Sequence, residues 1–206
     1  MSIMTDTEKI SEWLGSGSIN IFGLPFAGKD TQGKHLARDL GAVRLSGGEI
    51  LRGSDIPSHV KEAIDGGHMA PTDEYIEIVL PYLNRQEFVG KPLVLSSVGR
   101  WEGEEQGVLQ VAEQSGHPIK AVVHLDIDES EVRNRWRASL HLGDRGVRAD
   151  DAEHLLDTRL EEYRTKTIPV LKTYEDLGLL DRVSGLGTQE ETYQQILVKL
   201  LARAVA

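Results

Sequence analysis

The sequence predicts an α/β fold, in which a five-stranded parallel sheet carries helices on both faces. Three observations predict it. Short continuous apolar runs, which are typical of buried parallel strands, recur along the 206 residues. Segments with helical spacing separate these runs. A glycine-rich turn joins the first run to the helical segment that follows it. No internal repeat interrupts the pattern, so we expect one domain over 1–206.

The elements follow in chain order. A short amphipathic helix at 7–14 precedes the first strand, and Gly41 is a stop signal for the helix after the glycine-rich turn. The sequence DDAE at 150–153 has a capping-box pattern before the last and longest expected helix. The expected strands are 19–22, 42–45, 91–98, 119–127 and, most weakly, 179–185, and the expected helices are 31–41, 59–66, 72–84, 103–115, 129–140 and 151–176.

Composition excludes several classes of function. Hydrophobic residues at 39% and charged residues at 27% are typical of a soluble globular protein. No apolar run reaches about 18 residues and the N-terminus lacks a signal-peptide pattern, so we expect a cytoplasmic protein with no membrane partner. The absence of cysteine excludes disulfides, thiolate metal sites and thiol catalysis. A net charge of −10 argues against nucleic-acid binding. We expect a monomer.

The turn after the first strand has the pattern of a phosphate-binding loop. Residues Gly23 to Lys29 fit G-x-x-x-x-G-K between a strand and a helix. In such a loop, backbone N–H groups and the positive end of the helix hold phosphate oxygens, and the lysine ammonium bridges them. This predicts the three-layer sandwich of the P-loop NTPases. The alternative is an ordinary glycine-rich turn with a surface lysine. The slot that usually holds Ser or Thr is Asp30, and Thr31 follows it.

The segment GLPFAGKDTQ (23–32) resembles the first motif, G-x-P-G-x-G-K-G-T-Q, of the adenylate kinases and related nucleoside monophosphate kinases. Each further motif is weak alone, but together they are specific and extend from residue 19 to the end of the chain. They are LSGGEILR (45–52), GGHMAPTDEYI (66–76), LSSVGR (95–100), VRNRW (132–136), the run from Arg148 to Leu180, and VSGLGT (183–188).

This resemblance implies reversible transfer of the γ-phosphoryl group of ATP to a nucleoside monophosphate, with Mg²⁺ accompanying ATP. AMP is the first candidate; GMP or a pyrimidine monophosphate is the alternative, as is a nucleotide-binding protein that has lost transfer. The implied parts are a P-loop core, a monophosphate-binding excursion at about 46–84 and a short lid at about 137–149. The segment 137–147 is too short for the zinc-type lid of some relatives, and no cysteine is present, so we expect no zinc.

Phosphoryl transfer depends on positioned cations, and arginine presents a permanently charged, planar fork of donors. By resemblance, the catalytic residues are Lys29, Arg100, Arg135, Arg148 and Arg159; the alternative is that the arginines are ordinary surface charges. The implied ATP-binding residues are Gly23, Pro25, Phe26, Ala27, Gly28, Lys29, Asp30, Thr31, Arg135 and Gly187. The implied monophosphate-binding residues are Ser46, Gly47, Arg52, His68, Met69, Ala70, Ser97, Gly99, Arg100, Glu104, Arg148 and Arg159.

The sequence departs from the family pattern at the phosphate loop and the third strand. Phe26 and Asp30 replace loop glycines, Ser96 replaces an aspartate that orders magnesium waters, and residues 97–99 replace G-F-P. A carboxylate beside phosphates is repulsive unless a cation lies between them, and magnesium favours carboxylate and phosphate oxygens. We therefore hypothesise that Asp30 replaces the missing acid and binds Mg²⁺, directly or through water. The alternative is a first-turn helix acid that points away.

Two positions bear on the acceptor base. Adenylate kinases read adenine with a glutamine four residues after the motif arginine, where this chain has Glu104. An ionised carboxylate only accepts hydrogen bonds, so it matches guanine better than adenine. A shift that placed Gln106 in the pocket would favour AMP again, and Glu104 could also be a surface helix acid. Gly47 replaces the threonine of the family motif. Alanine at this position is typical of relatives that act on pyrimidine nucleotides, so a pyrimidine monophosphate stays an alternative acceptor. Trp101 could stack on the base or, as we favour, pack the loop.

Overall fold

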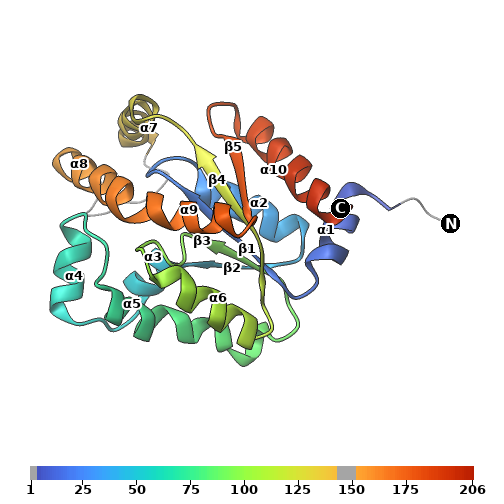
Figure 1. Ribbon diagram of the computed structural model, residues 1–206. Helices are drawn as coiled ribbons and strands as arrows, with labels where there is room; N and C mark the ends of the chain where they lie inside the picture. Colours follow the sequence, from blue (N-terminus) through green and yellow to red (C-terminus); the bar gives the residue numbers. More distant parts are fainter. Residues whose placement is uncertain (1–3, 143–151) are drawn as a thin grey trace.

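The computed structural model describes residues 4–142 and 152–206, with side chains at 4–140 and 152–206. All five strands are parallel, in the order β2-β3-β1-β4-β5, which confirms the predicted α/β class (Figure 1). Because β1 lies in the centre, the loop after it lies between the loops after β3 and β4. The strands are β1 (Ser18–Gly23), β2 (Val43–Ser46), β3 (Leu93–Ser96), β4 (Ile119–Asp126) and β5 (Leu180–Ser184).

Helices cover both faces of the sheet (Figure 1). Alternate side chains of β1 face opposite cores, since Ile19 and Ile21 pack with α1, α2, α7, α8 and α10, whereas Phe22 packs with α3, α4, α5, α6 and α9. The helices are α1 (Asp6–Leu14), α2 (Lys29–Asp39), α3 (Gly47–Gly53), α4 (Ser58–Asp65), α5 (Thr72–Val79), α6 (Glu104–Gln114), α7 (Glu129–Leu142), α8 (Glu153–Glu162), α9 (Ile168–Asp176) and α10 (Gln189–Ala204).

Two expected helices are divided. The segment 72–84 is α5 followed by a 3₁₀ turn, η1 (Leu80–Asn84), with a proline in its first positions. The segment 151–176 is α8, a π-helical turn η4 (Tyr163–Thr167), and α9. Proline lacks an N–H donor and disfavours regular helix just before it, which accounts for the first division.

The first two residues of the expected capping box at 150–153 lie outside the described residues, and α8 begins after Ala152, which makes no side-chain cap. Capping boxes are found instead at the starts of α1 and α10, where Thr5 pairs with Glu8 and Thr188 with Glu191. The helices expected from the sequence did not include α3 or α10. With 16 residues, α10 is the longest helix in the described part of the chain, whereas the sequence predicted that the longest helix would be 151–176.

Residues between β2 and β3 form a helical excursion. It contains α3, α4, α5, η1 and a second 3₁₀ turn, η2 (Gln86–Phe88), and α4 extends furthest from the sheet in Figure 1. Of the expected lid at 137–149, only the end of α7 belongs to the described chain. Within that described chain, no helix combines the length and apolar character that a membrane span requires.

Asn20 joins the loop after β3 to the central strand β1. It is fully buried on β1, donates from Nδ2 to the carbonyl oxygen of Val98 at 2.7 Å, and accepts from the Val98 N–H at 3.3 Å. The neighbouring Ser97 N–H donates to the carbonyl of Ile21 at 3.0 Å. The loop after β3 is therefore fixed against the strand that leads into the phosphate-loop motif.

We predict that Asn20→Leu destabilises the protein. The isosteric change leaves the buried polar groups of Val98 unpaired, which costs about 1–3 kcal/mol of the free energy of unfolding. Urea denaturation measures it. The control is Asn134→Leu on the exposed side of α7, which should change the free energy by less than about 0.5 kcal/mol. Equal effects of the two substitutions would contradict the role given to Asn20.

Candidate active site

Two clefts meet at the β1–α2 loop. We call the larger, about 620 Å³, the loop cleft; it lies along residues 26–32 and reaches Arg135 and Gly187. The smaller, about 130 Å³, is the excursion cleft, which lies between the same loop, the excursion and α8. Phe26, Lys29 and Asp30 line both. A group bound in one cleft can therefore reach the other across these three residues.

The loop is built to bring backbone close to a ligand. At Gly23 a Cβ atom would lie 2.8 Å from the carbonyl oxygen of Leu125, so only glycine fits there. Gly28 takes a left-handed conformation (φ 95°) and caps the start of α2, which begins at Lys29. The Lys29 ammonium donates to the carbonyl oxygens of Gly23 and Leu24 at 2.9 and 2.8 Å. The N–H groups and the positive end of α2 thus face the clefts with the lysine beside them.

Phe26 has a backbone conformation that favours glycine. It has φ of 62°, a conformation that costs a bulky residue about 1–3 kcal/mol. Its ring lies 5.7 Å from the guanidinium carbon of Arg159 and lines both clefts. Phenylalanine at this position therefore holds a conformation typical of glycine and adds an aromatic ring to the lining of both clefts.

Asp30 and Ser96 are neighbours across the junction of the clefts. The Ser96 hydroxyl donates to Asp30 Oδ1 at 3.3 Å. Arg44 Nη1 lies 3.6 Å from the same oxygen, but its Nη2 makes the closer pair, 2.6 Å from Glu49 Oε2. A carboxylate on α2 thus lies within hydrogen-bond distance of the side chain that ends the third strand.

Besides Lys29, four of the five predicted arginines lie on the clefts. Arg52, Arg100 and Arg159 line the excursion cleft, and Arg135 lines the loop cleft. Arg135 donates to the carbonyl oxygens of Gly185 and Phe26 at 2.6 and 3.4 Å and pairs with Glu131. Arg148 lies outside the described residues.

Burial affects the electrostatics of Arg100 in particular. Desolvation lowers the pKa of this guanidinium, and the nearby Arg159 acts in the same direction, against Tyr75 and Glu104. Because arginine stays charged even so, the site holds a concentrated positive charge that a phosphate would stabilise.

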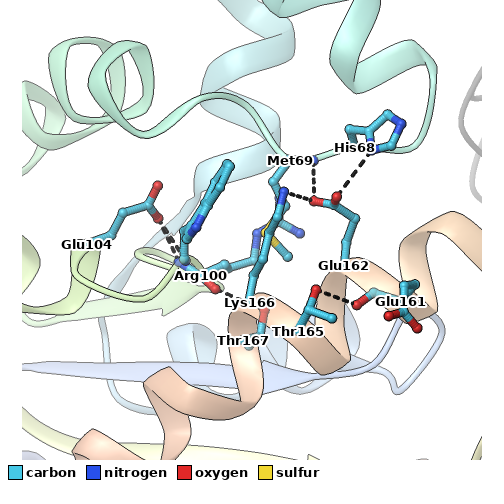
Figure 2. Close-up of polar contacts among 10 residues, drawn as sticks. His68, Met69, Arg100, Glu104, Glu161, Glu162, Thr165, Lys166 and Thr167 are labelled. Carbon is cyan, nitrogen blue, oxygen red and sulfur yellow. Dashed lines mark hydrogen bonds and ion pairs between the residues drawn. The ribbon is translucent and has the colours of Figure 1, made fainter.

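The Glu104 carboxylate accepts hydrogen bonds from the backbone of the loop after β3. Its carboxylate accepts from the N–H groups of Arg100 and Trp101 at 2.9 and 3.1 Å and is 2% exposed (Figure 2). Burial raises the pKa of Glu104, and those hydrogen bonds oppose the rise. Glu104 is absent from the linings of both clefts, and Gln106 is exposed on α6.

The other predicted residues divide between lining and support. Ala70, Gly47 and Gly99 are absent from the two linings. Ala27, Gly28, Thr31 and Gly187 line the loop cleft, whereas Gly23, Pro25, Ser46, His68, Met69 and Ser97 line the excursion cleft. Sequence reasoning missed the lining residues Gln32, Lys34, Thr188, Gln189, Glu162 and Tyr163. Of these, Thr188 carried a readable signal, its capping box with Glu191.

Gly47 is constrained by a tyrosine. A Cβ atom there would lie 2.8 Å from the Tyr75 hydroxyl oxygen and 3.3 Å from the carbonyl oxygen of Ser97. The same hydroxyl accepts from the Gly99 N–H at 2.9 Å. The phenol therefore occupies the space that a side chain at position 47 would need, next to the loop that carries Arg100.

A phosphate-type loop between two cation-lined clefts, at the carboxyl edge of a parallel sheet, defines a nucleotide-binding phosphotransferase. The family model described as adenylate kinase matches residues 21–179. An adenylate kinase of Thermus thermophilus is 32% identical over 186 residues, covering 87% of this chain and 94% of the relative. One from Caulobacter vibrioides is 31% identical, covering 82% and 90%, and one from Phocaeicola vulgatus is 27% identical, covering 87% and 95%. The chain belongs to the adenylate kinase family and is a nucleoside monophosphate kinase.

We predict that Gly47→Ala destabilises the protein by about 1–3 kcal/mol, because the new methyl group collides with the Tyr75 hydroxyl. Tyr75→Phe alone also destabilises, since it leaves the Gly99 N–H unpaired. The double variant should cost less than the sum, with a coupling of at least about 0.5 kcal/mol in urea denaturation.

The control is Gly53→Ala on the same helix, where a Cβ meets nothing within 4 Å. That change should be neutral or stabilising. Strict additivity of the position 47 and 75 variants would refute the proposed contact.

Proposed function

We propose that this chain transfers the γ-phosphoryl group of ATP reversibly to AMP. The observation that carries the proposal is the pair of clefts that share Phe26, Lys29 and Asp30, with arginines on both sides. The names of the relatives support AMP as the acceptor. ATP would occupy the loop cleft and the monophosphate the excursion cleft.

Direct in-line transfer needs no covalent enzyme intermediate. A phosphate oxygen of AMP attacks the γ-phosphorus of ATP, the bond to the β–γ bridging oxygen breaks, and two ADP molecules result. Lys29, the start of α2 and Arg135 would hold the donor phosphates, while Arg52, Arg100 and Arg159 hold the acceptor phosphate. Charge spreads over the phosphoryl oxygens in the transition state, so fixed cations supply most of the catalysis.

The residues at the cleft junction fit a magnesium ion. Asp30 offers a carboxylate and Ser96 a hydroxyl 3.3 Å from it, and Mg²⁺ in such sites is held by one or two carboxylates together with substrate phosphates. In the described part of the chain, no cluster of three or more His, Asp or Glu residues could hold a metal, and the proposed site takes its remaining ligands from the nucleotide. When bound, Mg²⁺ would neutralise charge on the phosphates. Asp30 would orient it, in place of the missing strand-end acid.

We expect ADP formation in a coupled assay with ATP and AMP, and less with GMP, CMP, UMP or dTMP. Lys29→Met should lower kcat/KM by about 10²–10³-fold, because one transition-state cation is lost. Lys91→Met, on the exposed surface beside β3, is the control and should leave the rate unchanged. Faster turnover with another monophosphate would reassign the acceptor. Nucleotide binding with no turnover on any of the five monophosphates would mean that the chain is a nucleotide-binding protein without transferase activity.

The role of Asp30 is tested by its response to magnesium. In wild type, MgATP should raise the midpoint of thermal unfolding more than ATP alone, and Asp30→Asn should remove most of this difference. The double variant Asp30→Asn/Ser96→Asp should restore it, since the acid returns to the strand end. Asp73→Asn, at the equivalent exposed first turn of α5, is the control. An unchanged magnesium response in Asp30→Asn would leave Asp30 as a plain helix-start acid.

A further inference from the structure

The link between α4 and α5, residues 66–71, docks directly on α8. Gly67 makes this possible. Its φ is +81°, and a Cβ atom there would lie 3.2 Å from the carbonyl oxygen of Leu155 and 3.5 Å from Cγ of Arg159. The backbone of the link at Gly67 therefore lies directly against α8, with no side chain of residue 67 between them. We call residues 66–71 the acceptor link, because His68 and Met69 within it line the excursion cleft.

Glu162, the last residue of α8, joins this link to the helix. Its carboxylate accepts from the Met69 backbone N–H at 3.1 Å, from His68 Nδ1 at 3.2 Å and from Lys166 Nζ at 2.6 Å (Figure 2). The side chain is only 13% exposed. Burial raises the pKa of Glu162, but the hydrogen bonds from Lys166, His68 and Met69 outweigh burial and lower it overall, so the group is a carboxylate at neutral pH.

Lys166 extends the same connection to the loop that carries Arg100. Its ammonium lies 3.6 Å from the centre of the Trp101 ring, which makes a cation–π contact and packs that ring against η4. The next residue, Thr167, donates from its hydroxyl to the Arg100 carbonyl oxygen at 3.0 Å. The π-helical turn thus presents Lys166 and Thr167 together to the loop after β3, and such turns often occur at functional sites.

We infer that Glu162 is a positioning residue for the acceptor nucleotide, an inference that rests on the proposed function. Three segments far apart in sequence bind the acceptor side: the acceptor link, the Arg100 loop and the Arg159 turn of α8. Glu162 contacts the first directly, the second through Lys166, and the third as the residue three positions after Arg159 on the same helix.

A negative group in a phosphate-binding cleft is tolerated because Lys166 and His68 pair with it. The three segments are therefore ordered before the nucleotide arrives, and the ordering cost on binding falls. Loss of Glu162 should therefore weaken binding of the acceptor nucleotide. It should leave ATP binding unchanged, because Glu162 does not line the loop cleft.

The test compares Glu162→Ala with Glu161→Ala. Glu161 is the neighbouring acid on the same helix; its side chain is 61% exposed, and among the contacts described its carboxylate pairs only with Arg164 at the surface. Amide hydrogen exchange of the free protein is the first readout. Glu162→Ala should speed exchange over residues 67–70 by about tenfold or more, because the Met69 N–H loses a charged acceptor, and Glu161→Ala should not.

Steady-state kinetics is the second readout. In Glu162→Ala the KM for AMP should rise about tenfold, whereas the KM for ATP stays within about twofold of wild type. Glu162→Gln, which keeps one acceptor oxygen, should fall between. Equal rises in both KM values would mean general loss of structure and overturn the inference, as would unchanged exchange at 67–70. Absence of turnover in the wild type with every monophosphate would defeat the proposed function instead, and the exchange result would still decide whether Glu162 holds the link.

Discussion

The register of the central strand is the constraint on which the site depends. β1 pairs with β3 on one side and β4 on the other, and both pairings are parallel, so the loops that follow these strands emerge at one edge. Asn20 then fixes the β3 loop to β1 through both polar groups of Val98. Lys29 and Arg100, 71 positions apart in the chain, therefore face one space because of backbone pairing.

The positive charge in that space is balanced locally in a protein that is acidic overall. Each carboxylate near the clefts has its own donors: Glu104 accepts from loop N–H groups, Glu162 from Lys166 and Met69, and Glu131 from Arg135. Asp30 lies at the junction itself, with a serine hydroxyl and a more distant guanidinium. The acids thus position the cations and the backbone, and the desolvated Arg100 remains directed at the cleft.

The positions that depart from the family pattern lie beside the clefts or against a side chain from another element. Phe26 has a left-handed backbone conformation, which favours glycine, and its ring lines the clefts. Gly47 has no side chain, and the Tyr75 hydroxyl lies in the space that a side chain there would need. Ser96 donates a hydrogen bond to the carboxylate of Asp30. At Gly47 and Ser96 the neighbouring side chain comes from another element, so a motif comparison along the chain does not detect it.

Local patterns were sufficient to predict the sheet, its parallel sense and the phosphate loop, because apolar runs, their alternation with helical segments and the G-x-x-x-x-G-K spacing can be recognised within short stretches of sequence. The sequence also determined which arginines to consider, through their motifs. The tertiary structure alone decided that Glu104 supports backbone, that α8 ends in a π turn, and that Glu162 connects three segments. The physical reason is that burial and pairing of a carboxylate depend on residues distant in sequence, whose N–H groups and ammonium carry no pattern around the acid itself.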